Sequence, residues 1–445
     1  MHIEDKEEGL KRVIGIPGIA ASVFNFTIGA GIFVLPAIIG IQLGPTAIIG
    51  YILCGLMFAA IMLCYVEIGS RIKTSGGSYA YVEAALGPFA GFIINWLFFF
   101  GWGILSSAAV MNVVADSLAV LFPVFSGWWM RSLLLLLMIA FMMLVNIRGA
   151  KESVRFVEIV TIIKFLPLLG IIIFGFNHIK AVNLQWDQLP TLKAFGETAL
   201  VLFFAFAGFE SALSASGEIK NPKRTIPTGI LLGGLLVFST YILLQVIVQG
   251  VLGPQLSEFK ATPLAAVANI IVGSLGATLL VAAAAISGFG SVSGDVLTSP
   301  RLLFAGANDG IFPKFLGRIH PRFSTPHWAV ITYASLIFVF SISGGFKQLA
   351  VLASGALLLI YFGVILAMIK LRRLKLQDEE KTFKVPGGLL IPGMALAAIL
   401  WVLSNLSKME MISVGAFLVV ICAMYVIMKK LQASPLAVAT KSIEE

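Results

Sequence analysis

The chain has 445 residues, of which 59% are hydrophobic and 12% charged, and its mean hydropathy of +0.99 lies far outside the range of soluble globular domains. Its apolar segments are mostly long enough for the roughly 20 residues that a helix needs to cross a bilayer, and they lack the alternating pattern of barrel strands, so we expect an all-α integral membrane protein embedded in the lipid bilayer. The net charge of +9 comes from cations dispersed along the chain, which argues against a nucleic-acid partner.

Taken in chain order, the apolar segments predict about twelve transmembrane helices. The eighth is overlong and rich in Ala, Gly and Ser, which predicts a tilted or kinked helix. A less apolar stretch, Gly76–Gly87, is expected to form a short amphipathic entry to the third helix. The predicted spans are Val13–Ile39, Pro45–Ser70, Pro88–Phe122, Met130–Asn146, Val154–Phe176, Phe195–Ser216, Pro227–Leu252, Leu264–Leu303, Trp328–Ser343, Leu349–Ile369, Gly388–Asn405 and Ile412–Ile427.

The distribution of basic residues sets the expected topology. Most of the 31 Lys and Arg residues fall in the two tails and in the alternate loops on the same side as the tails. By the positive-inside rule, the chain then lies in the cell membrane with cytoplasmic tails at 1–12 and 432–445. The three cysteines fall within spans and the four histidines lack metal-ligand spacing, so we expect no disulfide framework, no metal site and no cofactor.

Two predicted helices carry glycines at their centres. The stretch "FTIGAGIFVLP" in the first span holds Gly29 and Gly31, and "FFAFAGFES" in the sixth span holds Gly208. A glycine in a helix interior costs about 1 kcal/mol relative to alanine, so an irregular backbone is indicated at both places. Close helix packing is the alternative explanation, but the i, i+2 spacing of Gly29 and Gly31 does not suit a single packing face.

The positions of these two helices predict an internal repeat. If helices one to five form repeat one at 13–176 and helices six to ten form repeat two at 195–371, the interrupted helices occupy corresponding places. An odd number of helices per repeat makes the halves antiparallel, which indicates an inverted-repeat secondary transporter with its substrate site at the midplane. Two further helices at 386–431 complete the chain. The N-terminus of a half-helix carries about +0.5 charge and suits an anionic group.

Three motifs in order resemble those of the amino acid/polyamine/organocation (APC) transporters. They are "GAGIF" at 29–33, "FFAFAGFE" at 203–210 with "EIKNPKRTIP" at 218–227, and "RLLFAGANDGIFP" at 301–313, where Asn308 replaces the Arg usual in that family. The resemblance covers nearly the whole chain. It implies a LeuT-type five-plus-five inverted repeat with helices one and six unwound, which moves amino acids or related amines by alternating access.

The resemblance also implies a substrate site at the two breaks. The residues expected to bind the substrate carboxylate through their backbone are Ile28, Gly29, Ala30 and Gly31. The residues expected around the substrate amino group are Phe204, Phe206, Ala207 and Gly208. Phe204 matches an aromatic position that caps the substrate in relatives, and Glu210 resembles a carboxylate that links the two broken helices and helps the gate to reset.

Lys164 lies near the middle of the fifth span, in "TIIKFLP". A lysine there costs about 2.5 to 3.5 kcal/mol on insertion scales, which argues for a partner or a function. The resemblance implies that its amine fills the position of Na⁺ in sodium-coupled relatives and contacts carbonyls of the unwound first helix. Because burial disfavours the charged form, Lys164 is a candidate to take up and release a proton during transport. A fixed ammonium in an exchanger that moves no net proton is the alternative.

Asp295 lies in the eighth span, close to the predicted midplane, where many amino-acid permeases have an apolar or aromatic residue. Arg301 is on a different face, so an i, i+4 pair does not neutralise the carboxylate. Three possibilities are open: Asp295 is protonated, pairs with Lys164, or contacts a cationic substrate. Four glutamates near span ends are expected to reach water by snorkelling, namely Glu67, Glu158, Glu197 and Glu218.

The sequence therefore favours an amino-acid permease, not an enzyme, that takes up a neutral amino acid by proton coupling or exchange. A transporter or exchanger of cationic amino acids or polyamines is the alternative, favoured by Asp295. A membrane-embedded hydrolase is disfavoured because the chain has no His-Glu-x-x-His or Gly-x-Ser-x-Gly motif. A channel would not need two broken helices in corresponding positions. Whether a partner subunit exists is left open.

Overall fold

The computed structural model describes residues 14–72, 77–148, 153–186, 189–213, 219–308, 310–373 and 383–432. Within these ranges the expected all-helical architecture is confirmed, and the only β-type contact is a parallel bridge between Ile14 and Ile219. Eight of the described helices are long and apolar enough to span a membrane by length and composition, and shorter apolar helices accompany them. The protein is therefore built as a multi-pass helical bundle.

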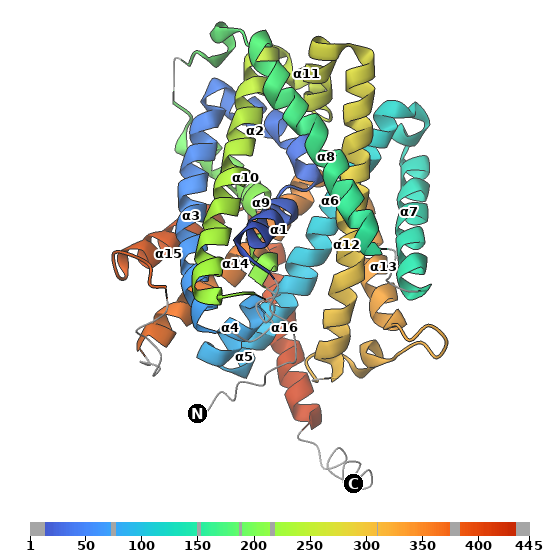
Figure 1. Ribbon diagram of the computed structural model, residues 1–445. Coiled ribbons are helices and arrows are strands. Elements are labelled where there is room, and N and C mark those ends of the chain that lie inside the picture. Colours follow the sequence, from blue (N-terminus) through green and yellow to red (C-terminus); the bar gives the residue numbers. More distant parts are fainter. Residues whose placement is uncertain are drawn as a thin grey trace.

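The helices of the first part of the chain are α1 (Ile16–Thr27), α2 (Leu35–Leu43), α3 (Ala47–Arg71), α4 (Gly77–Leu86), α5 (Pro88–Trp96), α6 (Ile104–Leu121), α7 (Trp128–Arg148) and α8 (Ser153–Gly175). Those of the second part are α9 (Leu192–Phe206), α10 (Pro222–Leu252), α11 (Pro263–Val272), α12 (Ser274–Asn308), α13 (His327–Ser343), α14 (Phe346–Arg373), α15 (Leu390–Leu403) and α16 (Lys408–Gln432). Figure 1 shows α1 and α9 in the middle of the bundle, with α7 and α15 at its two sides and the end of α16 projecting at the bottom.

Burial follows this arrangement. α9 is buried from Phe195 to Phe206 except at Glu197, and α14 buries most of its length, whereas α7 and α16 expose leucine, isoleucine and valine side chains. In a bilayer such exposed apolar faces meet lipid at no hydrophobic cost. α1 packs on α10, while α12 packs on both α6 and α8. The core therefore brings the two glycine-containing helices together with helices from both halves of the chain.

Two predicted spans are more irregular than expected. The predicted eighth span, Leu264–Leu303, is two helices, because Gly273 has φ +85° and its N–H caps α11 at the Asn269 carbonyl. A left-handed residue ends a helix, and glycine adopts that conformation without steric cost. The predicted third span is interrupted by a π-helical segment, Leu97–Gly103, between α5 and α6. The predicted amphipathic entry forms α4, although Gly76 lies outside the described residues.

Glu67 does not snorkel, and that expectation was wrong. Its side chain on α3 is 0% exposed and accepts hydrogen bonds from the Arg71 Nη2 at 2.8 Å and the Arg372 Nε at 2.7 Å, both on Oε1. The Arg372 Nη2 and the Val385 N–H, the latter at 2.8 Å, donate to Oε2. Arg372 also donates to the Gly388 carbonyl at 2.6 Å. One buried carboxylate thus ties α3, the end of α14 and the segment before α15 together.

The other three glutamates differ from Glu67 or cannot be compared with it. Glu197 is exposed, with its Oε1 4.0 Å from the Lys193 Nζ, as snorkelling to water requires. The side chain of Glu158 and the whole of Glu218 lie outside the described residues.

Replacing Glu67 with glutamine should destabilise the protein markedly. Gln keeps the size but leaves two arginines without their carboxylate, and removing one partner of a buried ion pair costs about 3 to 5 kcal/mol. The apparent Tm of the purified protein, measured by thermal unfolding, should fall by several degrees or more. Glu197→Gln is the matched control, because exposed pairs contribute only about 0 to 1 kcal/mol. Equal Tm values for wild type and Glu67→Gln would show that the cluster is not a structural tie.

Candidate functional site at two helix breaks

The first break separates α1 from α2. α1 ends at Thr27, Ile28 leaves the helical region with φ −83° and ψ 86°, and a short 3₁₀ segment, Ala30–Phe33, precedes α2. The N–H groups in the first turn of a helical segment have no acceptor within that segment. The backbone at Ala30 and Gly31 therefore offers donors and a partial positive charge in the middle of the bundle.

The two glycines of this break have different surroundings. Gly29 has φ −94° and ψ −159°, an extended conformation open to any residue, and a Cβ built there would meet nothing within 4 Å. A close-packing role therefore does not fit Gly29, which borders open space. A Cβ on Gly31 would lie 3.5 to 3.7 Å from the side chains of Leu35, Phe204 and Phe346, which is ordinary van der Waals contact.

The second break ends α9 and crosses the first. Ala207 is extended with ψ 156°, and Gly208 has φ +115°. A Cβ on Gly208 would lie 2.6 Å from the Phe26 carbonyl oxygen and 3.2 Å from the Thr27 Cα. Only glycine satisfies both the left-handed φ and this close approach of two backbones. The last carbonyls of α9 have no intrahelical donor, so this helix end carries partial negative charge next to the first break.

Glu210 anchors the second break to α14. Its carboxylate accepts the Gly208 N–H at 3.1 and 3.2 Å and the Tyr361 hydroxyl at 3.0 Å, and the residue is 5% exposed. Of the predicted site residues on α9, Phe206 points its ring elsewhere, into a cluster with Tyr51, Phe58 and Tyr241. Only the backbone of Phe206 is therefore left to face the break.

Phe204 covers the first break together with two aromatic residues that the sequence did not single out. Its ring centroid lies 5.6 Å from that of Trp102 and 5.6 Å from that of Phe346, the latter edge to face. Trp102 belongs to the π-helical segment, and Phe346 begins α14. No local sequence signal distinguishes either residue from the other aromatic side chains of the chain. Their placement closes one side of the break with an aromatic layer.

Lys164 reaches the first break from α8. Its Nζ donates to the carbonyls of Asn25 at 3.0 Å and Ile28 at 2.8 Å, and the residue is 3% exposed. These carbonyls belong to the C-terminal end of α1, where the helix dipole is negative and favours a cation. Among the described residues, no carboxylate forms a salt bridge with Lys164. Within the part of the chain that the structure describes, the amine is thus held by backbone oxygens.

Asp295 is held by hydroxyl groups and not by Lys164, so the suggested Lys164–Asp295 pair is wrong. Its Oδ2 accepts the Ser107 hydroxyl at 2.5 Å and the Tyr333 hydroxyl at 2.7 Å, and its Oδ1 accepts the Ser299 hydroxyl at 2.7 Å. The cluster lies where α6, α12 and α13 meet. A Cβ on Gly288 of α12 would lie 3.1 Å from the Ala30 Cβ. Asp295 follows Gly288 by two helical turns, or about 10 Å, so it is offset from the first break along α12.

Comparison with known proteins gives this arrangement a family context. The family model described as amino acid permease matches residues 14–434. The Serine/threonine exchanger SteT of Bacillus subtilis (strain 168) is 28% identical over 447 residues, which cover 98% of this chain and 100% of that protein. Branched-chain amino acid permease BcaP of the same organism is 26% identical over 441 residues, or 94% of this chain and 93% of that protein.

A plant protein is similar over a smaller share of its own length. Cationic amino acid transporter 4, vacuolar, of Arabidopsis thaliana is 27% identical over 371 residues, which cover 78% of this chain and 61% of that protein. These relatives are transporters and not enzymes. Since the family model spans nearly the whole chain, including both helix breaks, the chain belongs to the amino acid permease family of multi-pass membrane proteins.

Proposed function

We propose that this protein is a secondary active transporter that takes up a neutral amino acid by alternating access. The observation that carries the proposal is that the two breaks meet in the bundle. Gly208, just past the acceptor-rich end of α9, packs on the Phe26 carbonyl at the end of α1. The donor-rich start of the 3₁₀ segment Ala30–Phe33 follows that end of α1 directly, and a Cβ on Gly31 would lie 3.6 Å from the Phe204 ring of α9. A zwitterion needs donors for its carboxylate and acceptors for its ammonium within one small site. Opposed helix ends supply both without a charged side chain.

The proposed pose follows from these polarities. The carboxylate is bound by the backbone N–H groups of the stretch from Ile28 to Gly31, and the ammonium by carbonyls between Phe204 and Ala207. The open space beside Gly29 supports the approach of a ligand to the backbone there. Phe204, backed by Trp102 and Phe346, caps the ligand. The aromatic layer excludes water, which strengthens every polar contact below it.

The proposed architecture has twelve membrane helices, with repeats at 13–176 and 195–371 related by inversion and two added helices at 386–431. Its support is that both breaks interrupt helices at corresponding places of the two repeats, as the pattern of inverted-repeat transporters requires. Both termini are proposed to lie on the cytoplasmic side of the cell membrane, because of the distribution of basic residues.

Glu210, which bonds to Gly208 and Tyr361, is the proposed residue that helps the gate to reset.

Lys164 is the proposed coupling residue. Its ammonium group donates hydrogen bonds to two carbonyls at the first break, those of Asn25 and Ile28. These carbonyls must move if α1 tilts during transport. Loss of its proton would remove both charge-assisted bonds to Asn25 and Ile28 and free α1. In the alternative, the ammonium never titrates and the protein exchanges substrates without net proton movement.

A second candidate function is transport of a cationic amino acid or a polyamine. The observation that favours it is the Asp295 carboxylate, whose hydrogen-bond partners among the described residues are neutral hydroxyls, so its negative charge is available to a cationic ligand. The resemblance to a relative named as a cationic amino acid transporter points the same way. The first candidate is preferred because the backbone groups suited to a carboxylate are present at the first break, and polyamines carry no carboxylate.

Gly29→Val should abolish amino-acid binding without preventing folding. The backbone at Gly29 accepts a side chain and the space beside it is open, so the valine side chain would occupy the volume proposed for the ligand. At a ligand concentration of about 100 Kd, wild type should gain about 2.7 kcal/mol of apparent stability, and the variant none. The measurement is a thermal shift of purified protein against a panel of neutral amino acids.

The control for this variant is Gly415→Val, where a Cβ also meets nothing within 4 Å, on α16, a helix whose main contacts are with α5 and α14. It should keep the wild-type shift. Wild-type affinity in a folded Gly29→Val protein would remove Gly29 from the proposed site.

Asp295→Asn separates the two candidate substrates. For a neutral amino acid bound at the helix ends, Asn should change affinity by less than about threefold, because the substituted side chain makes no contact with the ligand's charges. For a cationic ligand, loss of a nearly desolvated charge-assisted contact should cost about 2 to 5 kcal/mol, or well over tenfold in Kd. Asp116→Asn serves as control, since Asp116 is a partly exposed carboxylate that already pairs with Arg131. Tight binding of putrescine to wild type, with no binding of any neutral amino acid, would overturn the preference for a neutral substrate.

A further inference from the structure

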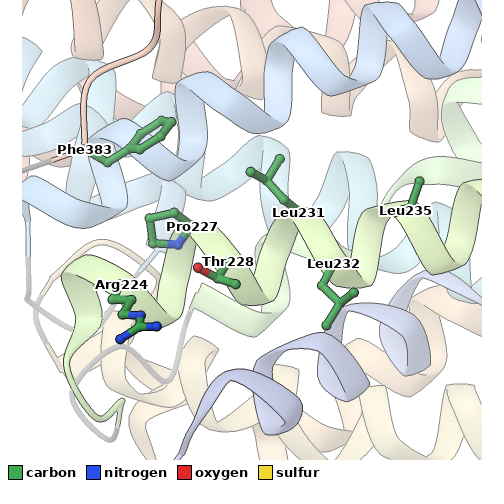
Figure 2. Close-up of a pocket in the computed structure, with 7 residues that line it drawn as sticks. All are labelled: Arg224, Pro227, Thr228, Leu231, Leu232, Leu235 and Phe383. Atoms are coloured by element: carbon green, nitrogen blue, oxygen red, sulfur yellow. The ribbon is translucent and has the colours of Figure 1, made fainter.

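A groove at the start of α10 lies outside the proposed transport site. It contains part of the "EIKNPKRTIP" motif, which the transport proposal leaves without a role. Its volume is about 630 Å³, and its lining residues are Arg224, Pro227, Thr228, Leu231, Leu232, Leu235 and Phe383. Figure 2 shows Arg224 at one end of a row of side chains along α10, Leu235 at the other end, and Phe383 on a separate segment beside the row.

The chemistry changes in one direction along this row. Arg224 and Thr228 are four residues apart, so they share a face of α10 and present a guanidinium and a hydroxyl together. Both are exposed, and no described carboxylate forms a salt bridge with Arg224. Leu231, Leu232 and Leu235 follow with 40%, 43% and 60% exposure. The order is cation, hydrogen-bond donor and then apolar surface.

The length of the row fits one leaflet of a bilayer. From Arg224 to Leu235 the helix rises by about 16 Å, close to half of a hydrocarbon core of about 30 Å. Arg224 is the last of three basic residues, after Lys220 and Lys223, and an apolar run follows it along α10. Basic residues at the end of an apolar run are typical of the membrane surface, so this order puts the guanidinium near the headgroups and the leucines among the acyl chains. The bridge between Ile14 and Ile219 puts this end of α10 on the side of the N-terminal segment.

The opposite wall of the groove is held in place by the buried Glu67 cluster. Phe383 lies two residues before Val385, whose N–H donates to Glu67 at 2.8 Å, and Arg372 fixes Gly388 just beyond. The groove thus has one wall from α10 and one from a segment anchored to α3 and α14. An acyl chain lying in it would contact leucines on one side and an anchored aromatic ring on the other.

We propose that this groove binds one anionic phospholipid from the leaflet on the side of the N-terminal segment. Its phosphate is bound by the Arg224 guanidinium and the Thr228 hydroxyl, and one acyl chain follows Leu231, Leu232 and Leu235 against Phe383. The negative headgroup is selected because Arg224 lacks a described carboxylate partner, and a guanidinium binds phosphate oxygens in a bidentate manner. The order of groups in the lipid, phosphate then ester then hydrocarbon, matches the order along α10.

The test compares wild type, Arg224→Gln and Arg318→Gln after reconstitution into vesicles of equal parts phosphatidylglycerol and phosphatidylcholine. Each protein is then extracted in mild detergent, and the phosphatidylglycerol that stays bound is counted by native mass spectrometry. Wild type should retain phosphatidylglycerol over phosphatidylcholine. Arg224→Gln should retain about fivefold less, which corresponds to about 1 kcal/mol for one basic residue at the surface. Arg318 is exposed outside the groove, so its variant should behave as wild type.

A second variant blocks the groove and removes the Thr228 hydroxyl while Arg224 is kept. Thr228→Trp places a bulky ring at an exposed position within the groove and keeps the guanidinium, so it should also lose the retained lipid. Unchanged retention by both variants would overturn the proposal. Displacement of the lipid by inorganic phosphate at millimolar concentration would mean a bare anion site without an acyl chain, and would overturn it as well. None of these readouts depends on transport.

Discussion

The close crossing of two broken helices is the constraint on which the described architecture depends. Gly208 touches the backbone of Phe26 and Thr27 with no room for a side chain, and its φ of +115° is open only to glycine at low cost. This contact puts the end of α9 against the end of α1. In a continuous helix, the N–H and C=O groups at these positions would bond to each other within the helix. At the breaks they are instead free to bond across to the other helix or to a ligand between the two. In a membrane such groups persist only where protein or ligand satisfies them.

The buried polar side chains of the bundle are each matched by hydrogen-bond partners, at the breaks and away from them. Lys164 binds two carbonyls released at the end of α1, and Glu210 binds the N–H released at Gly208. Asp295 and Glu67 are likewise surrounded by donors, the first by three hydroxyls and the second by two arginines and a backbone N–H. An unpaired charge would be far more costly at these positions than in water. Each of these groups joins helices that are distant in sequence, so polar contacts position the elements around the breaks.

The sequence predicted the breaks better than it predicted what surrounds them. Glycines within an apolar run are a local signal, and both breaks lie at the predicted glycines, although the strain falls on Gly208 while Gly29 has an ordinary backbone. An ionisable residue near the middle of an apolar span is also a local signal, and it singled out Lys164 and Asp295. The error at Glu67 arose because its partner Arg372 is 305 residues away, beyond any local window. Trp102, Phe346 and the hydroxyl partners of Asp295 were missed for the same reason: they are ordinary helix residues that only tertiary packing brings together.

The central claim is that the two opposed helix ends bind a zwitterion, one end for each charge. The most direct measurement uses wild type and three ligands. The first is the neutral amino acid that binds best, and the other two are its methyl ester and its N-acetyl derivative. The affinity for each derivative is compared with the affinity for the amino acid. Each analogue removes one charge and leaves the side chain unchanged. Hydrogen bonds to charged groups contribute about 1.5 to 3 kcal/mol, so each analogue should bind at least about tenfold more weakly in isothermal titration calorimetry. An ester or an N-acetyl derivative that binds as tightly as the amino acid would contradict the claim.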